Sequence, residues 1–194
     1  MADKDTALGL LERGLREVPV YRWLLGEDAS ADTYRWYGEL LFTETFHGLR
    51  GLFDDSGSLL ALMAISEPSH ERVPVDEDLA ARTRHHILAI DGFIDRFTEL
   101  RNANAAASVA DHAICIVFVV VHPDHRRAGT LTSLADPVVE RGLREGIPVV
   151  ASTADPVMSE VYTRRWRAPV RAEYSLTDGP TVWVHRSDPP APQP

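Results

Sequence analysis

The order of apolar and polar positions divides the chain into helical and extended segments. Apolar residues recur at steps of three and four from Thr6 to Val18, which predicts a helix that Pro19 ends or follows with a new turn. Similar spacing predicts helices from Ala31 to Phe46, after the N-cap Ser30, and from Asp78 to Leu100. The aromatic residues of the second helix are expected mainly in the core, with a substrate-pocket wall as the alternative: Tyr34, Trp36, Tyr37, Phe42 and Phe46.

Extended segments lie between and after these helices. LRGLF and LLALMAI are joined by the turn DDSGS, which predicts a β-hairpin. The stretch from Ala113 to Val121 is apolar on both faces, which is typical of a central strand. PVVAST predicts a short buried strand between helices at Leu131–Gly146 and Asp155–Trp166, and RAEYSL with TVWVH predicts a closing hairpin. The order of elements predicts a mixed α/β single domain.

Composition limits the classes of function. The 194 residues fit one domain, and 20 lysines and arginines against 29 acidic residues give a net charge of -9. This charge disfavours binding to nucleic acid or an anionic membrane and tolerates a cationic small molecule. No apolar run reaches the roughly 18 residues that span a bilayer, and no signal peptide opens the chain. Because the lone Cys115 cannot form a disulfide within the chain, we expect a soluble, cytoplasmic protein.

The chain shows one expected boundary, close to its C-terminal end. Residues 1–186 are expected to form the folded domain, since no internal repeat or long linker divides them. Residues 187–194, SDPPAPQP, are rich in proline and contain no apolar anchor. We therefore predict that these last residues form a flexible tail.

None of the histidine positions predicts a metal site. His85 and His86 are adjacent and point in different directions on a helix. His122 and His125 lack a third ligand at metal-binding spacing. The chain also has no Gly-x-Ser-x-Gly elbow, no P-loop and no Cys-x-x-Cys pair. We therefore expect no metal cofactor.

The stretch VFVVVHPDHRRAGTLTSL, from Val117 to Leu134, joins the central strand directly to a helix. The first backbone amides of such a helix are unpaired and can bind an anion. Gly129 would let the backbone approach a diphosphate, and Arg126 and Arg127 add positive charge. The alternative is a solvated basic start of a helix.

The same residues resemble a known family signature. VVVHPDHRRAGTLTSL is similar to the acyl-CoA signature of the GCN5-related N-acetyltransferase (GNAT) superfamily, and GLFDDSGSLLALMAISEP, EGIPVVAST and VYTRRW resemble the puromycin N-acetyltransferase type. The likeness extends from about Leu8 to about His185. It implies a single GNAT-type domain with a mixed central sheet, helices on both faces, and a splayed pair of strands that forms the acyl-CoA cleft.

The resemblance also implies how a co-substrate would bind. Acetyl-CoA or another acyl-CoA would pair its pantetheine arm with main-chain groups of Val119 and Val121. The amides that would cradle the pyrophosphate belong to consecutive residues of the turn and the following helix: Arg126, Arg127, Ala128, Gly129, Thr130, Leu131 and Thr132. Leu131 occupies the place of a second small residue in the family pattern.

Two positions are implied to take part in catalysis. Tyr162 matches the family tyrosine that protonates the leaving thiolate, although Trp166 and Arg167 replace the Gly-Phe that usually follows. Ser152 stands where puromycin-type relatives have an acidic residue that deprotonates the amine. Since a serine is too weak a base, three routes remain open: a water chain anchored by Ser152, a histidine such as His47 or His112, or an acceptor amine that is already neutral.

Together these features predict an enzyme that moves an acetyl or short acyl group from acyl-CoA to an amine of a small molecule. Antibiotic self-resistance or natural-product tailoring is the role that the resemblance suggests. One alternative keeps the GNAT fold and uses its cleft for other chemistry. Another is a non-catalytic CoA- or ligand-binding partner. The expected partners exclude nucleic acid and membrane, and a homodimer is left open.

Overall fold

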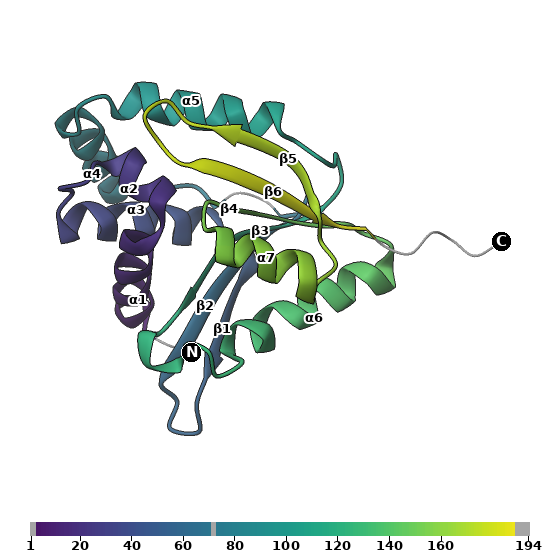
Figure 1. Ribbon diagram of the computed structural model, residues 1–194. Helices are drawn as coiled ribbons and strands as arrows, with labels where there is room; N and C mark the ends of the chain where they lie inside the picture. The colour runs from purple at the N-terminus through teal and green to yellow at the C-terminus, as the bar shows by residue number, and fades with distance from the viewer. Residues whose placement is uncertain (1–2, 71–72, 189–194) are drawn as a thin grey trace.

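Six strands form one mixed sheet in the order β1-β2-β3-β4-β6-β5 (Figure 1). The computed structural model describes residues 3–70 and 73–188. β3 and β4 run parallel, whereas the other neighbouring pairs are antiparallel. The strands are β1 (Leu49–Phe53), β2 (Leu59–Ser66), β3 (Ile114–Val121), β4 (Val149–Thr153), β5 (Val170–Ser175) and β6 (Thr181–Ser187). The predicted mixed α/β single domain is confirmed.

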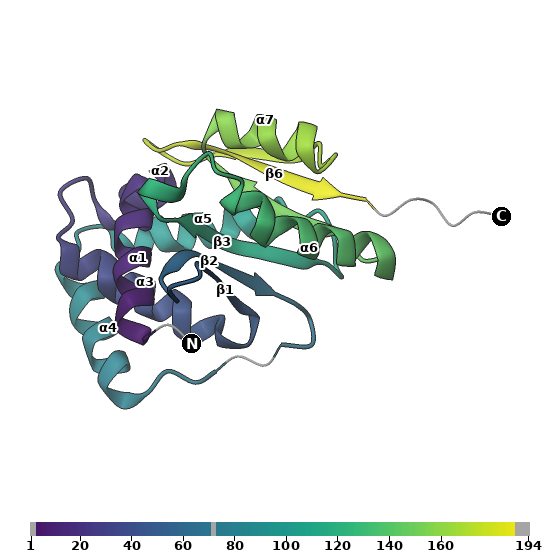
Figure 2. The ribbon, with the colours of Figure 1, turned by 90° about the horizontal axis from the view of Figure 1, so that it is seen from below.

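Helices cover both faces of this sheet. Figure 2 shows α6 and α7 on one side and α1 with α3 on the other. The α-helices are α1 (Lys4–Glu17), α2 (Pro19–Leu25), α3 (Ala31–Glu44), α4 (Glu77–Ala89), α5 (Phe93–Ala106), α6 (Thr130–Glu145) and α7 (Pro156–Arg165). Two short 3-10 helices, η1 (Phe46–Gly48) and η2 (Pro123–His125), precede β1 and follow β3.

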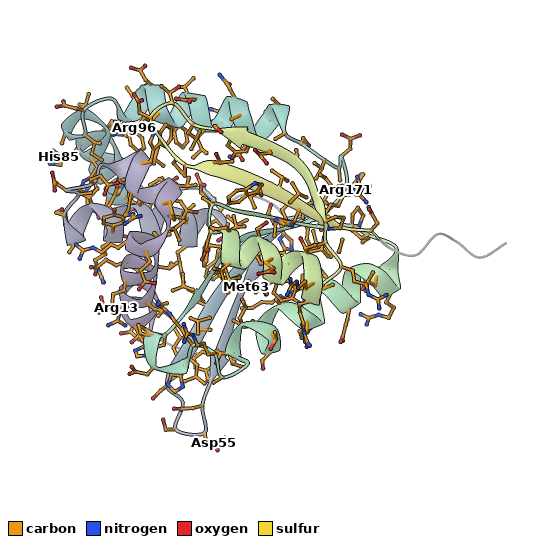
Figure 3. The ribbon with its side chains drawn as sticks, in the orientation of Figure 1. Arg13, Asp55, Met63, His85, Arg96 and Arg171 are labelled. Atoms are coloured by element: carbon orange, nitrogen blue, oxygen red, sulfur yellow. The ribbon has the colours of Figure 1, made fainter. Side chains whose placement is uncertain are left out.

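Local side-chain chemistry sets the predicted helix start and hairpin turn. The hydroxyl of Ser30 accepts a hydrogen bond from the amide of Thr33 at 3.2 Å and caps α3. Between β1 and β2, one carboxylate oxygen of Asp54 accepts from the amides of Ser56 and Ser58, each at 2.9 Å. The hairpin therefore turns where the sequence predicts it, with Asp55 at its tip and Met63 within the sheet (Figure 3).

The single helix predicted from Asp78 to Leu100 is wrong, because two helices occupy this segment. Ile90 has an extended backbone, and Gly92 has φ of 69°, so α4 ends and α5 begins in a new direction. Both helices nevertheless bury apolar residues, Leu79 and Phe93, in the same core cluster. The periodic spacing continues across the break, and periodicity alone could not reveal it.

A glycine lets α1 lie close to the sheet beside the end of β3. A Cβ added at Gly14 would lie 2.3 Å from a methyl group of Val120, so a larger residue would push α1 and β3 apart. Pro19 both follows the end of α1 and begins α2, where its missing amide is tolerated. This packing brings Glu17 at the end of α1 close to the turn that follows β3.

The last strand extends into the segment predicted as a tail. Ser187, the first residue of the predicted tail 187–194, is the last residue of β6 and is buried. The tail residues 189–194 lie outside the described residues. Within the described parts of the chain, no helix combines the length and the apolar character that crossing a membrane requires.

Candidate functional site

The parallel strands β3 and β4 pair over three positions and then separate. The pairs are Ile114 with Val149, Cys115 with Val150, and Ile116 with Ala151. In the pairing of β3 with β2, the register shifts immediately after Ile116, so that Val117 is the extra residue of a β-bulge. Beyond this point β3 continues along β2 and β4 continues along β6. We call the unpaired region between Val117–Val121 and Ser152–Thr153 the fork.

Main-chain groups of β3 face the fork at the two positions expected from the sequence. The amide of His122 donates to the carbonyl of Leu60 at 2.8 Å, which shows that this position turns its hydrogen-bonding groups towards β2. Because alternate residues of a strand turn these groups to opposite sides, Val119 and Val121 present theirs away from β2. The structure therefore turns the main-chain groups of both valines towards the fork, although the carbonyl of Val121 already accepts a hydrogen bond from Nε of Arg126 at 3.3 Å.

The turn between β3 and α6, residues 122–132, exposes a series of backbone amides. Arg127 and Gly129 have φ of 63° and 82°, in the left-handed region. The first hydrogen bond of the helical pattern runs from Ser133 N to Gly129 O at 2.9 Å, so the amides of Thr130–Thr132 have no partner in the helix. The hydroxyl of Thr130 donates to the carbonyl of His125 at 2.7 Å, which connects the first residue of α6 to the preceding part of the turn.

The two arginines of the turn are in different situations. Arg126 pairs with Glu17 of α1 at 2.7 Å, and its Nε donates to the carbonyl of Val121 at 3.3 Å. This arginine therefore joins the turn to α1, and its charge is partly balanced. Arg127 and Ala128 are exposed at the open side of the turn, and Leu131 is half-buried. An anion at this turn would be held mainly by backbone amides, with the exposed Arg127 as a cation of the same turn.

Tyr162 of α7 lies over the point where the two strands part. Its ring, together with Ile116 and Ala151, lines a cavity of about 20 Å³. The rings of Trp166 and His185 lie 5.4 Å and 5.3 Å from it, between centroids. Burial, together with the nearby negative charge of Asp155, raises the pKa of Tyr162 to about 12. The side chain is therefore a protonated phenol at neutral pH.

His185 forms one wall around this tyrosine and was missed by sequence reasoning. It is 1% exposed, its Nδ1 donates to the carbonyl of Ala168 at 2.8 Å, and its Nε2 accepts from the hydroxyl of Ser159 at 3.0 Å. Burial lowers its pKa, with partial compensation from the bond to Ala168. A neutral imidazole with both nitrogens engaged serves as packing and is no base. Its partners lie 17 and 26 residues away in sequence, so no local signal marks it.

The candidate base positions lie at different distances from the fork. Ser152 is exposed on β4, and strand alternation puts it on the face opposite Ala151 and Tyr162. His47 belongs to η1, before the outermost strand β1, and His112 precedes β3 at the end opposite the turn. Neither histidine lies on the strands that border the fork, so the histidine route to a base stays a prediction that these positions do not favour.

Asp155 is a carboxylate at the site that sequence reasoning used only as the start of a helix. One of its oxygens accepts from the amide of Val157 at 2.8 Å and caps α7. Its charge acts on the hydroxyl of Tyr162 and favours the protonated phenol. The Asp-Pro pair that begins α7 was the available signal, but its distance from Tyr162 could not be known without the fold.

The histidines do not gather into a metal site. His122 and His125 have ring centroids 5.7 Å apart, and His85 lies on α4 at the outer edge of the molecule (Figure 3). Among the residues that the structure describes, no three side chains of His, Cys, Asp or Glu come together as metal ligands.

Several solved structures share this architecture. A histone acetyltransferase HPA2 and related acetyltransferase from Corynebacterium glutamicum matches with a TM-score of 0.71 and 14% identity, over 100% of this chain and 96% of that chain. Arylalkylamine N-acetyltransferase 2 from Aedes aegypti gives 0.66 and 12%, over 95% and 93%. An agmatine N-acetyltransferase gives 0.61 and 14%, over 95% and 94%.

These matches show a shared fold at low sequence identity. No family model matches the chain, and no curated protein matches it. The six-stranded mixed sheet with helices on both faces is the fold of the GNAT acetyltransferases.

Proposed function

We propose that the protein is a GNAT-type N-acyltransferase that moves an acetyl or other short acyl group from acyl-CoA to an amine of a small molecule. One observation carries this proposal: the fork, the turn of free amides and the protonated Tyr162 lie together at one end of the β3–β4 pair. Each feature is common alone. Together they supply a place for an extended thioester, its diphosphate and its leaving sulfur.

The residues present fit acyl-CoA as co-substrate. The main-chain groups of Val119 and Val121 that face the fork would pair with the amides of the pantetheine arm. The amides from Arg127 to Thr132 would bind the pyrophosphate at the start of α6, where Gly129 leaves the backbone accessible. The amide of Arg126, which the sequence also predicts to take part, donates to the carbonyl of Pro123 at 3.3 Å and would have to release this bond first. The half-buried Leu131 contributes its amide in place of the small residue usual in the family pattern.

The transfer follows from these positions. The amine nitrogen attacks the thioester carbonyl carbon, a C–N bond forms, and the C–S bond breaks as the electron pair leaves on sulfur. The phenol of Tyr162 donates a hydrogen bond to the developing thiolate and transfers its proton to it. The attacking nitrogen loses a proton on the other face of β4, through water held by Ser152 or before binding. If the water route operates, the phenol of Tyr162 and the water held by Ser152 act from opposite faces of β4.

A small amine is the acceptor class that the chain favours. A net charge of -9 suits a cationic ligand, and the names of two structural neighbours specify an arylalkylamine and agmatine. The likeness to the puromycin N-acetyltransferase type supports a role in antibiotic self-resistance or natural-product tailoring. We place the enzyme in the cytoplasm, without nucleic acid or membrane partners, and keep a homodimer as its candidate assembly.

A second function is favoured by the absence of a carboxylate on the two strands that border the fork. A protein that keeps the fold and binds CoA could use the fork for other chemistry or act as a non-catalytic partner. Such a protein would still bind CoA at the β3–α6 turn. It would not release free CoA in the presence of an amine.

The test measures binding and turnover separately. Thermal unfolding in the presence of acetyl-CoA, CoA and longer acyl-CoAs should show a rise in melting temperature that increases with ligand concentration. Thiol release from acetyl-CoA is then followed with a panel of aliphatic and aromatic amines. Amine-dependent thiol release supports the acyltransferase. Firm CoA binding without release from any amine supports the second function, and absence of binding contradicts both.

A further inference from the structure

Helices α6 and α7 are joined by one carboxylate, Asp136. Its Oδ1 accepts a hydrogen bond from Nε1 of Trp166 at 2.7 Å, and its Oδ2 accepts from the guanidinium of Arg165 at 2.6 Å. Although burial alone would raise its pKa, the bonds from Arg165 and Trp166 hold the pKa of Asp136 below its usual range. The carboxylate is therefore ionised at neutral pH and has both oxygens engaged.

The indole held by Asp136 is a direct neighbour of Tyr162. The two rings lie 5.4 Å apart and share the wall of the 20 Å³ cavity. The carbonyl of Tyr162 also accepts from the amides of Trp166 and Ala168, at 3.3 Å and 3.2 Å. A movement of Trp166 would therefore reach both the ring and the backbone of Tyr162.

The opposite wall is anchored independently. His185 meets the ring of Tyr162 edge to face, with 88° between planes, and is fixed by Ser159 and Ala168. These contacts come from α7 itself, β6 and the segment between α7 and β5. The contact through Trp166 and Asp136 differs because it extends to α6, which begins at the turn of free amides.

From this geometry we propose that Asp136 is a positioning residue for Tyr162. By accepting the Nε1–H of Trp166, Asp136 fixes the phenol relative to α6, the helix whose first turn would bind the diphosphate of acyl-CoA. This inference rests on the proposed function for its catalytic consequence. The ring of Trp166 packs against Tyr162, and its N–H supplies a directional bond that a phenylalanine could not make. Position 166 therefore adds orientation as well as volume.

Three variants separate positioning from general stabilisation. Asp136→Ala removes both bonds, and Trp166→Phe keeps an aromatic ring while it removes the N–H. Glu39→Ala is the matched control, because Glu39 also joins helices through two cations, Lys4 and Arg82, each at 2.8 Å. Burial would raise the pKa of Glu39, and these bonds lower it, as at Asp136. Glu39 lies on α3, on the face of the sheet opposite α7.

The first readout is the phenol of Tyr162, independent of activity. Phenolate absorbance is titrated for each variant with and without Tyr162→Phe, and the difference isolates this residue. Because burial is the main cause of the raised pKa, a loosened ring should gain water, and its pKa should fall by about one unit in Asp136→Ala and Trp166→Phe. Glu39→Ala should leave it unchanged.

The second readout is turnover with acetyl-CoA and a competent amine. We expect kcat to fall about tenfold in Asp136→Ala and Trp166→Phe, while the Kd for CoA stays within about twofold. Unchanged kcat and unchanged phenol pKa in Trp166→Phe would overturn the inference, even if Asp136→Ala does not fold. A shifted phenol pKa in a protein without acyl transfer would keep the positioning role and contradict the proposed function alone.

Discussion

The β3–α6 turn and the surroundings of Tyr162 lie at the same fork but are built in opposite ways. The turn offers backbone amides, is largely exposed, and is formed by consecutive residues. Tyr162 is enclosed by side chains from β6, α6 and α7, whose own polar atoms are already bonded. A local segment can supply a general anion site, whereas a half-buried phenol of fixed orientation needs contacts from distant parts of the chain.

The difference has a chemical reason. A diphosphate is large, charged and tolerant of small shifts, so several amides can share it. A proton donor must lie within about 3 Å of the leaving atom and point at it, so its ring must be held on both sides. The turn should therefore govern affinity, and the tyrosine surroundings should govern rate.

Tyr162→Phe should give the largest effect. The variant keeps the ring between Trp166 and His185 and removes only the proton, so we expect kcat to fall about 10²- to 10⁴-fold. Calorimetry should give an unchanged Kd for CoA. Normal turnover in this variant would mean that Tyr162 serves only in packing.

Gly129→Val tests the other half of the comparison. At φ of 82° a β-branched residue is strained and would also block the approach of the diphosphate, so CoA binding should weaken about 100-fold, or about 3 kcal/mol, by calorimetry. Gly57→Val is the matched control, because Gly57 has φ of 84° and open space around it in the β1–β2 turn. It should lose similar stability and bind CoA normally. Equal CoA affinity in both variants would remove the turn from the site.

The pH dependence of the free energy of unfolding should show the effect of the half-buried phenol of Tyr162. The pKa of Tyr162 is raised from 10.0 to about 12. The contribution of the protonated phenol to the free energy of unfolding is therefore fully present below pH 10 and is lost as the pH rises through 12. After allowance for partial exposure, we expect the wild type to lose about 1–2 kcal/mol more than Tyr162→Phe over this range. Urea unfolding at a series of pH values measures the difference. Parallel curves for the two proteins would show that Tyr162 is solvated.

Ser187→Ala should give the smallest effect, and it should be stabilising. The hydroxyl of Ser187 is buried beside the 20 Å³ cavity without a hydrogen-bond partner among the described residues. Removing an unsatisfied hydroxyl should raise the free energy of unfolding by about 1 kcal/mol, measured in urea. Ser56→Ala, at an exposed turn where the hydroxyl bonds Asp54 at 2.6 Å, is the contrasting substitution and should destabilise slightly. A loss of stability in Ser187→Ala would indicate that the hydroxyl has a partner, such as a bound water.

The β3–α6 turn could be predicted from the sequence, whereas the surroundings of Tyr162 could not. The strand–turn–helix around Gly129 could be predicted because its apolar run, basic pair and glycine are contiguous. The break at Gly92 was missed, since the apolar spacing continues across it into α5. The walls of the tyrosine site could not be predicted, because His185 and Asp136 lie 23 and 26 positions from Tyr162 in opposite directions along the chain. Only the fold brings them together.

The three-position pairing of β3 with β4 has a consequence for local unfolding. Strand edges held by so few hydrogen bonds open more readily than the long antiparallel pairs on either side. Amide protons of Val119 and Val121 have no neighbouring strand to protect them and should exchange rapidly with solvent in the free protein. A ligand arm that fills the fork would act as the missing strand, slow this exchange, and make one continuous sheet of the two halves.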